Sequence, residues 1–555
     1  MTDGFNLLDR PWIPCMRAAD GAWEDLSLRD VLVRAHELRE IVDPSPLVTV
    51  SLHRLLLAFL HRVFGPASID EWAALWERGS WDPDPIDRYC ERWRNRFNLF
   101  DPTYPFYQTP AVDASYAKPV AGIVHGMMLG NYLTLFDHSV ATDPPALSPA
   151  QAARYLVAYQ AFDVGGMISY QSRHGEEASV AKYTKAGPLT TSAVALVTGR
   201  NLFQTLMLNL HAYNGADGLP FHFTDDSAAW ERDEHPTPRE RRPSGYVDLL
   251  TWQSRRVRLL PESAEGNAAP VVRYAVAMKG EQFPAGWNPA DYEPMVAFRK
   301  SLKPRDGMPP WFPIGFQEDR ALWRDSLALF QSVSGQSARP KMLDWVAGLA
   351  AEGPLGSRAR FALDLYGMVT DQANVTLWRH ERLPLPAPLL NDRERYELLQ
   401  EALGLAERVS TLLVNDVVTV TGADGKTRKL PSPLRVFAQT LAAPDDAVTP
   451  SPTTVRSIAE SLAPSAVYWS RLAVPFSQLV SDLGGDVAGD PLARWALEIQ
   501  RTAQVAFSSV IHSLDSSARA LKAAALAERA FNRLLREMLT GYLPAREEET
   551  DEPAA

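Results

Sequence analysis

A proline cluster near residue 386 divides the sequence into two parts with different hydrophobic patterns. The run Pro384-Leu385-Pro386-Ala387-Pro388 favours extended backbone and is typical of a domain boundary. A chain of 555 residues is also too long for one ordinary domain. The sequence therefore predicts two domains, at residues 1–385 and 386–545. Residues 546–555 are rich in acidic side chains, and we expect them to form a disordered tail.

Helical periodicity dominates the part beyond the proline cluster. Asp490 and Pro491 occupy the N-cap and first-turn positions before one apolar stripe, and Gly541 ends the last helix. A further helical stretch, with interruptions, runs over residues 453–483. The three clearest stripes are Tyr396, Leu399, Leu403 and Ala406; Leu492, Trp495, Ile499 and Ala506; and Ala524, Ala527, Phe531, Leu534 and Met538. Four such segments, each with one apolar face, predict an antiparallel four-helix bundle.

The first part of the chain mixes helical and extended patterns. Apolar residues repeat at helical spacing over residues 52–63, and Gly65-Pro66 ends that helix. Residues 246–260 and 271–278 alternate in the manner of strands. We therefore expect an α+β protein, in which a large mixed α/β N-terminal domain precedes the C-terminal four-helix bundle.

Composition narrows the classes of function. Two cysteines, Cys15 and Cys90, support neither a disulfide framework nor a cysteine-based zinc site. The sequence has no signal peptide and no run of about 18 apolar residues, so we expect a soluble cytoplasmic protein that does not enter membranes. The net charge of −11 argues against a protein that coats DNA, but it leaves room for a local DNA reader held by other subunits.

A search for catalytic motifs finds little. The sequence contains neither a glycine-rich phosphate loop nor a His-Glu-x-x-His ligand set, so we expect no cofactor and no metal. Two loops, at residues 172–177 (SRHGEE) and 378–382 (WRHER), join histidine to arginine and carboxylates. Either loop has the groups for acid–base or nuclease chemistry, or is simply a charged surface loop.

Five segments, in order along almost the whole chain, resemble the CasA family, the large subunits of type I-E CRISPR Cascade complexes. The segments are residues 5–14 (FNLLDRPWIP), 104–109 (YPFYQT), 247–253 (VDLLTWQ) with Arg258 and Leu260, 366–381 with its YG, DQA and RHE groups, and 523–538 around AERA. This resemblance implies a mixed α/β domain followed by a four-helix bundle.

The resemblance also implies a function and its partners. The family recognises the short motif that flanks a target in double-stranded DNA, starts unwinding of the duplex and holds the displaced strand. It later provides a docking surface for the helicase–nuclease, while the guide RNA reads the target sequence. The expected partners are the other Cascade subunits, the CRISPR guide RNA, double-stranded target DNA, the displaced non-target strand and the helicase–nuclease. No catalysis is expected of the chain itself.

Individual roles follow from the same resemblance. Gln372 matches the wedge glutamine that enters the duplex beside the flanking motif, and Asn374 adds a second amide. Gly165 and Gly166 match the start of a glycine loop that approaches the minor groove, where this chain has two glycines instead of a fuller cluster. Lys279 is the nearest match to a minor-groove lysine.

Three further points complete the expected site. The position of the minor-groove lysine alternatively falls on Gln282, which would replace a cation by an amide. Leu135, Phe136, Asp137 and His138 lie where the family has a loop that contacts the guide RNA end and the flanking motif. Residues 261–270 lack the cysteine cluster that some relatives carry, so no zinc is expected.

Two other functions remain open from the sequence. One is a nuclease or RNA-processing enzyme that uses the Arg173-His174 or Arg379-His380 loop. The other is an assembly scaffold without DNA contact. Cleavage assays on labelled nucleic acid would identify the first, and binding assays on duplexes with and without a flanking motif would identify the second.

Overall fold

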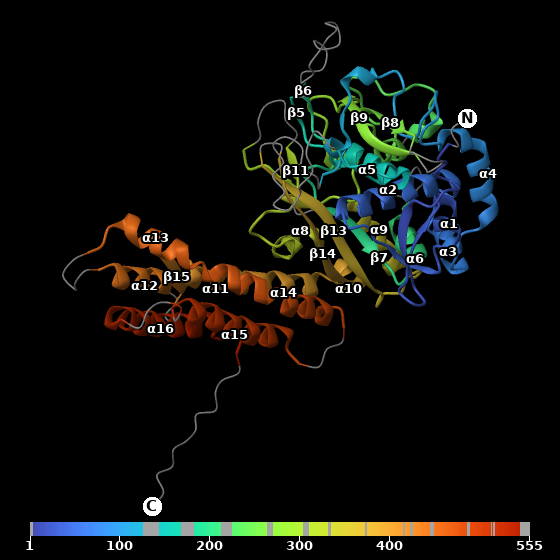
Figure 1. Ribbon diagram of the computed structural model, residues 1–555. Coiled ribbons are helices and arrows are strands. Elements are labelled where there is room, and N and C mark those ends of the chain that lie inside the picture. Colours follow the sequence, from blue (N-terminus) through green and yellow to red (C-terminus); the bar gives the residue numbers. More distant parts are fainter. Residues whose placement is uncertain are drawn as a thin grey trace, which may run out of the picture. The chain divides into compact units, whose positions relative to one another are not determined.

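The computed structural model divides the chain into two compact units, residues 1–383 and 384–555 (Figure 1). This division lies two residues before the predicted boundary. The structure describes residues 4–125, 144–167, 183–212, 225–263, 270–303, 310–330, 335–371, 374–414, 417–421, 426–443, 449–485, 489–511, 513 and 517–543.

Helix α2 (Pro46–Val63) forms the centre of the first unit. Pro46 occupies the first turn, where its missing N–H costs nothing. From Leu47 to His61 every residue of the helix is buried, and a helix covered on all sides belongs in the middle of a core. Helix α5 (Pro149–Phe162) packs against α2 (Figure 1). The helix predicted over residues 52–63 is therefore confirmed, within longer bounds.

The other described helices and strands of this unit are all shorter than α2. The remaining α-helices are α1 (Leu28–Val33), α3 (Ile69–Arg78), α4 (Pro83–Trp93), α6 (Leu202–Asn209), α7 (Tyr246–Leu250), α8 (Ser326–Phe330) and α9 (Lys341–Glu352). The strands are β1 (Ile13–Arg17), β2 (Trp23–Leu26), β3 (Leu38–Ile41), β4 (Lys118–Pro119), β5 (Gly166–Met167), β6 (Tyr183–Thr184), β7 (Val194–Thr198), β8 (Arg255–Glu262), β9 (Val271–Lys279), β10 (Phe298–Lys300), β11 (Trp311–Pro313), β12 (Ser337–Ala338), β13 (Arg360–Asp371) and β14 (Asn374–Pro386). They form small sheets in the orders β2-β1-β3, β4-β9-β8, β5-β6, β11-β10-β12 and β14-β13-β7.

The strand prediction for residues 246–260 is wrong over its first nine residues, 246–254. Residues 246–250 form helix α7, and the strand β8 begins only at Arg255. The Asp226 carboxylate accepts hydrogen bonds from the backbone N–H groups of Val247 (2.8 Å) and Asp248 (3.0 Å). A carboxylate at this position stabilises the start of a helix, and it comes from a segment 21 residues upstream. The strand predicted over residues 271–278 is confirmed by β9, which pairs antiparallel with β8.

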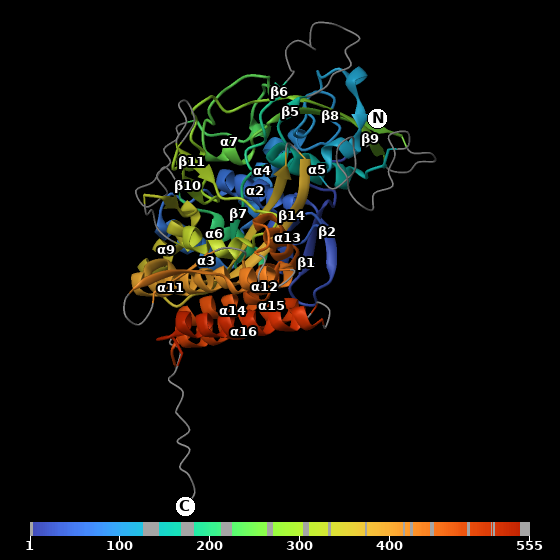
Figure 2. The ribbon, with the colours of Figure 1, turned by 90° about the vertical axis from the view of Figure 1, so that its left-hand side faces the viewer.

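The second unit is mainly helical. Its helices are α10 (Ala387–Asn391), α11 (Arg393–Ser410), α12 (Pro433–Ala442), α13 (Pro452–Leu462), α14 (Pro464–Leu483), α15 (Pro491–Ile511) and α16 (Ala518–Leu539), with a β15 (Val417–Thr421) and β16 (Thr427–Pro431) hairpin. The helices predicted from periodicity are all present, and Asp490 caps α15 through the N–H of Leu492 (2.8 Å). Helix α12 and the hairpin were not predicted. Helix α15 packs against α14 and α16, and the three lie side by side in both views (Figures 1 and 2).

Candidate nucleic-acid interface

Helix α5 leads the chain to the first predicted site residues, Gly165 and Gly166. The helix begins at a capping box, in which the Ser148 hydroxyl accepts the N–H of Gln151 and the Gln151 side chain accepts the N–H of Ser148. Shortly after the helix ends, β5 pairs with β6, with Gly166 opposite Thr184. We call residues 163–167, which include both glycines, the glycine segment.

The local structure explains why glycine occupies each of these two positions. A Cβ atom on Gly165 would lie 2.7 Å from the backbone nitrogen of Ala186 and 3.0 Å from the carbonyl oxygen of Thr184. Gly166 has a φ of 154°, a conformation that only glycine adopts readily. The fold therefore requires bare backbone at both positions, whatever the glycine segment binds.

A fully buried arginine, Arg255, fixes the glycine segment to the sheet. Its guanidinium pairs through Nε with the Asp163 carboxylate, and Nη2 donates to the carbonyl oxygens of Lys185 (2.9 Å) and Val164 (3.3 Å). The Gln160 side chain bonds both backbone groups of Arg255 at 2.9 Å. Arg255 thus bonds the residues just before β5 and the residue just after β6. Because one planar guanidinium makes all of these bonds, it fixes the glycine segment relative to β8.

Lys185, just beyond β6, lies in a compact polar cluster. Its backbone N–H donates to Gln282 Oε1 (2.6 Å), and its Nζ donates to Glu240 Oε1 and to the Phe283 carbonyl oxygen, both at 2.7 Å. The hydrogen bond from Lys185, its charge and then the charge of Lys279 hold the pKa of Glu240 below its ordinary value. Both Lys185 and Glu240 remain about half exposed.

Lys279 lies close to this cluster at the end of β9. It is opposite Arg255 in the β8–β9 pairing, and its carbonyl oxygen accepts from Arg256 Nε (2.9 Å). The structure therefore brings the predicted residues Gly165, Gly166 and Lys279 into one region. The alternative residue, Gln282, is only 3% exposed, and its amide is used by the backbone of Lys185 and Glu281. Lys279 remains our candidate for the cationic contact.

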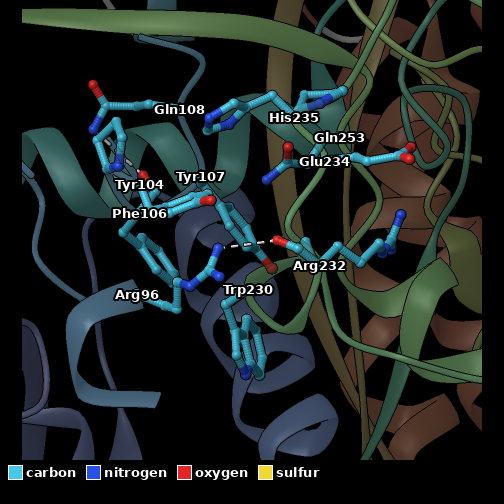
Figure 3. A pocket seen from close by; sticks show the side chains of 13 residues that line it. Arg96, Tyr104, Phe106, Tyr107, Gln108, Trp230, Arg232, Glu234, His235 and Gln253 are labelled. Carbon is cyan, nitrogen blue, oxygen red and sulfur yellow. Dashed lines mark hydrogen bonds between the residues drawn. The ribbon is translucent and has the colours of Figure 1, made fainter. Parts of the chain in front are cut away.

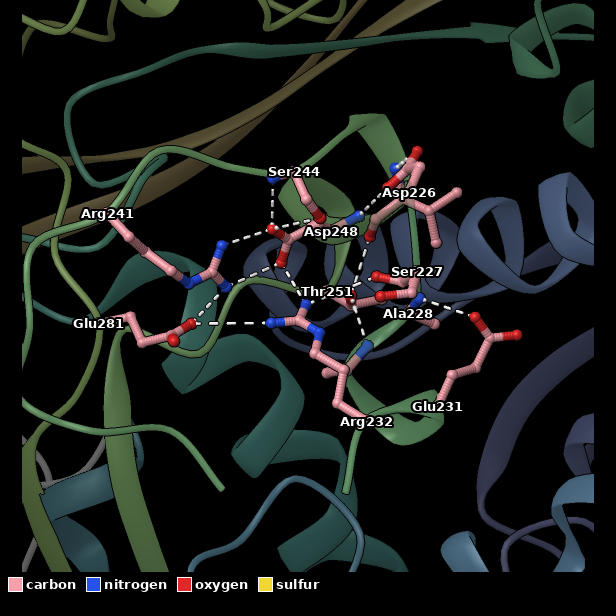
Figure 4. A network of polar contacts seen from close by, with 12 residues as sticks. Asp226, Ser227, Ala228, Glu231, Arg232, Arg241, Ser244, Asp248, Thr251 and Glu281 are labelled. Carbon is pink, nitrogen blue, oxygen red and sulfur yellow. Dashed lines mark hydrogen bonds and ion pairs between the residues drawn. The ribbon is translucent and has the colours of Figure 1, made fainter. Parts of the chain in front are cut away.

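A network of buried charges supports the cluster from inside (Figure 4). The fully buried Asp248 accepts from Arg241 Nη2 (2.9 Å), from the Ser244 N–H (2.7 Å) and from Arg232. Arg241 also pairs with Glu281, and its guanidinium lies 4.2 Å from the ring centre of Trp252. Burial raises the pKa of Asp248, but the hydrogen bond from Arg241 and the charge of Arg232 bring it below its ordinary value.

The remaining predicted contacts fall elsewhere. Gln372 and the loop of Leu135, Phe136, Asp137 and His138 lie outside the described residues. Asn374 is the first residue of β14, and β13 ends at Asp371, so the two strand ends flank the position of Gln372. Asn374 thus belongs to the β14-β13-β7 sheet, and the glycine segment belongs to the β5-β6 sheet.

Within the Arg379-His380 group, His380 is exposed and pairs with a buried carboxylate, Asp364. His380 Nε2 is hydrogen-bonded to Asp364 Oδ1 (2.6 Å), and the His380 ring stacks on Tyr366 at 4.5 Å. Arg382 also pairs with Asp364 (2.7 Å), and Thr198 donates to it. Burial raises the pKa of Asp364, but the hydrogen bonds from His380 and Arg382 hold it at about 2. These contacts join β14, β13 and β7 and give His380 a structural role; residues 172–177 lie outside the described part.

Two of the segments that carry the family resemblance line one small pocket that is open to solvent (Figure 3). Gln108 accepts from the Leu259 N–H (2.8 Å) and donates to the Leu99 carbonyl oxygen (2.7 Å). Arg96 donates to the Arg232 carbonyl oxygen (3.1 Å) and stacks on Tyr104. These polar groups bond to the protein itself, so the motif at residues 104–109 connects loops of the first unit.

Two arginines of the first unit, Arg299 and Arg379, are paired within the protein. Arg299 pairs with Asp325 (2.9 Å), and Arg379 donates to the carbonyl oxygens of Glu318 and Arg320. Lys300 and Lys303 are exposed on and beside β10.

Within the described ranges, no three His, Cys, Asp or Glu side chains are arranged to hold a metal ion. Cys15 and Cys90 are both buried and unpaired with each other. Among the described helices, none combines the length and apolar character needed to cross a membrane.

The chain matches one protein family over most of its length. The sequence model of the family described as CRISPR-associated protein Cse1 matches residues 6–506. A CRISPR-associated protein CasA/Cse1 from Thermus thermophilus is 31% identical over 542 residues, which cover 96% of this chain and 98% of that protein.

Solved structures show the same fold. The crystal structure of CasA from Thermus thermophilus matches with a TM-score of 0.76 and 30% identity, over 96% of this chain and all of that chain. Thermobifida fusca Cse1 matches with a TM-score of 0.76 and 26% identity, over 98% and 99% of the two chains. A chain of a CRISPR RNA-guided surveillance complex shares the fold at 22% identity, with a TM-score of 0.73 and coverage of 96% and 99%.

Proposed function

The chain belongs to the CRISPR-associated Cse1 family, and from this premise we propose that it is the large subunit of a type I-E CRISPR RNA-guided surveillance complex. In this role it recognises the protospacer-adjacent motif in double-stranded DNA and helps to start unwinding and R-loop formation. It also offers a docking surface to the helicase–nuclease and catalyses no reaction itself. The observation that carries the proposal is a family match that spans residues 6–506.

The proposed DNA contacts come from three sheets of the first unit, β5-β6, β4-β9-β8 and β14-β13-β7. Gly165, Gly166 and Lys279 approach the flanking motif from the region of β5 and β9, where the backbone is bare and anchored by Arg255. Gln372 enters the duplex from between the ends of β13 and β14, with Asn374 beside it. Leu135, Phe136, Asp137 and His138 contact the guide RNA end of the complex and the flanking motif.

The second unit has a separate role in this proposal. The domain of residues 386–545 acts as a four-helix bundle, for which the long helices α11, α14, α15 and α16 are the candidates. Each has apolar residues buried along one face, as a bundle requires. The other Cascade subunits and the guide RNA hold the whole chain, whose net charge of −11 disfavours independent coating of DNA.

The test is reconstitution of the complex with and without this chain. Small CRISPR-associated subunits and a guide RNA should co-purify with the tagged chain. A pool of duplexes that carry the guide-matched target and randomised flanking bases is then offered to both complexes. We expect the complete complex to enrich particular flanking bases and the complex without the chain to enrich none. Equal enrichment by both would reject the role in motif recognition.

Lys279→Ala should reduce the salt dependence of binding by the complete complex. Loss of one phosphate contact flattens the slope of log affinity against log salt concentration by about 0.9. The measurement is duplex affinity between about 50 and 200 mM salt, with Lys300→Ala as a control for a lysine on a different sheet. An unchanged slope for Lys279→Ala would show that Lys279 does not contact a phosphate.

A further inference from the structure

A carboxylate pairs with one of the two lysines beside the glycine segment. Glu240 Oε1 accepts from Lys185 Nζ at 2.7 Å, and the charge of Lys279 also acts on Glu240. Glu240 is about half exposed, so it faces the solvent that DNA would displace. The three side chains therefore present a net charge of +1 instead of +2 to an approaching phosphate.

The backbone holds Glu240 at this place. The Arg239 carbonyl oxygen accepts the Gln282 N–H, and the Arg241 N–H donates to the Gln282 carbonyl oxygen, both at 2.9 Å. These bonds form an isolated bridge between Glu240 and Gln282. Arg241 is itself locked by Asp248 and Glu281 in the buried network (Figure 4). The backbone that carries Glu240 is therefore fixed, while its side chain remains about half exposed.

The Lys185 ammonium group already donates two hydrogen bonds, but the side chain is not buried. Of its three ammonium protons, one goes to Glu240 and one to the Phe283 carbonyl oxygen. The third has room to meet a phosphate, because the side chain is 43% exposed. A phosphate at Lys185 would still lie next to the Glu240 carboxylate, and like charges repel at such distances.

From this arrangement we infer that Glu240 is a specificity-determining residue, which weakens attraction of Lys185 and Lys279 to DNA of any sequence. Only a duplex whose flanking motif fits the glycine segment gains enough additional contact to overcome the carboxylate. Non-specific affinity comes almost wholly from phosphate contacts, so a single carboxylate at this place acts mainly on non-cognate DNA. This inference rests on the proposed role of the chain in motif recognition.

Glu240→Gln keeps the shape of the side chain and removes its charge. In the complete complex we expect one more effective phosphate contact on DNA that lacks the flanking motif. One such contact steepens the salt slope by about 0.9, roughly a threefold gain in affinity at 50 mM relative to 200 mM salt. Affinity for DNA with the motif should rise less, so the ratio between the two should fall.

Glu262→Gln is the matched control. Glu262 is similarly exposed and lies 3.7 Å from Arg273, but it is opposite Val271 at the other end of the β8–β9 pair. Seven residues of strand separate it from Arg255, about 23 Å. The same change of charge there should leave discrimination unaltered. Equal effects of Glu240→Gln and Glu262→Gln would overturn the inference, because only the overall charge would then matter.

The double variant Lys185→Ala with Glu240→Gln identifies the group through which Glu240 acts. Most of the gain should disappear when Lys185 is absent, and a gain that persists in full would overturn this part of the inference. Failure of the proposed function looks different. In that case the wild-type complex would show no preference for a flanking motif, whereas failure of the inference leaves that preference intact and equal in wild type and Glu240→Gln.

Discussion

Replacing Asp248 by alanine is expected to lower the free energy of unfolding of the first unit by about 3–5 kcal/mol. The Asp248 side chain is fully buried and pairs with both Arg232 and Arg241. Without the Asp248 carboxylate, the guanidinium groups of Arg232 and Arg241 stay charged and largely buried but lose their main anionic partner. The network also supports Glu281 and Gln282, so this variant should loosen the cluster around Lys185 as well.

Denaturant unfolding followed by tryptophan fluorescence measures this change. Only Trp469 and Trp495 of the 15 tryptophans lie beyond residue 383, so the signal reports chiefly on the first unit. Glu37→Ala is the control, because Glu37 and its partner Arg34 are both partly exposed, at 52% and 32%. An exposed pair of this kind contributes roughly 0–1 kcal/mol. Losses of equal size for the two variants would show that the buried network does not stabilise the fold.

The helical part of the chain was predictable because its signals are local. In α16 the residues Ala524, Ala527, Phe531 and Leu534 are all buried, as their spacing predicts. Asp490 caps α15 from the adjacent position. The prediction for helix α7 failed for the opposite reason. The start of α7 is capped by Asp226, which lies too far along the chain to belong to the local sequence pattern around residue 246. Local pattern alone therefore assigned an extended conformation to residues that a distant carboxylate holds in a helix.

The candidate site was predictable only in part. Gly165, Gly166 and Lys279 were found through a family resemblance, and the structure places them in one region. Arg255 and Glu240 were missed. Arg255 did carry a signal, because it alternates with Val257 and Leu259 on the buried face of β8. An arginine on an inward-facing position needs acceptors inside the protein, but the sequence does not show that these are Asp163, Val164 and Lys185.

Glu240 shows why electrostatics is harder to predict than secondary structure. It is 55 residues from Lys185 in the sequence, and its position depends on a backbone bridge to Gln282. Exposed glutamates are common in a chain with 67 acidic residues. Only the fold distinguishes the one that lies against a lysine of the candidate interface.

Gln372→Ala is expected to weaken capture of fully paired target DNA by roughly tenfold to a hundredfold, while the complex still assembles. Unstacking a base step costs on the order of a few kcal/mol, and a wedge compensates part of that cost as the duplex opens. Tenfold in affinity corresponds to about 1.4 kcal/mol. Strands β13 and β14, which flank this position, are tied to β7 by Asp364 and its partners His380, Arg382 and Thr198.

The decisive comparison uses two targets with the same flanking motif, one fully paired and one with its strands already separated beside the motif. Gln372→Ala should barely affect the open target, because the unwinding cost is then absent. Gln400→Ala, which removes an exposed glutamine side chain from α11, is the control and should leave both targets unaffected. Equal losses on both targets would assign Gln372 to general binding of DNA. No loss on either target would leave Gln372 as a turn residue without a part in opening the duplex.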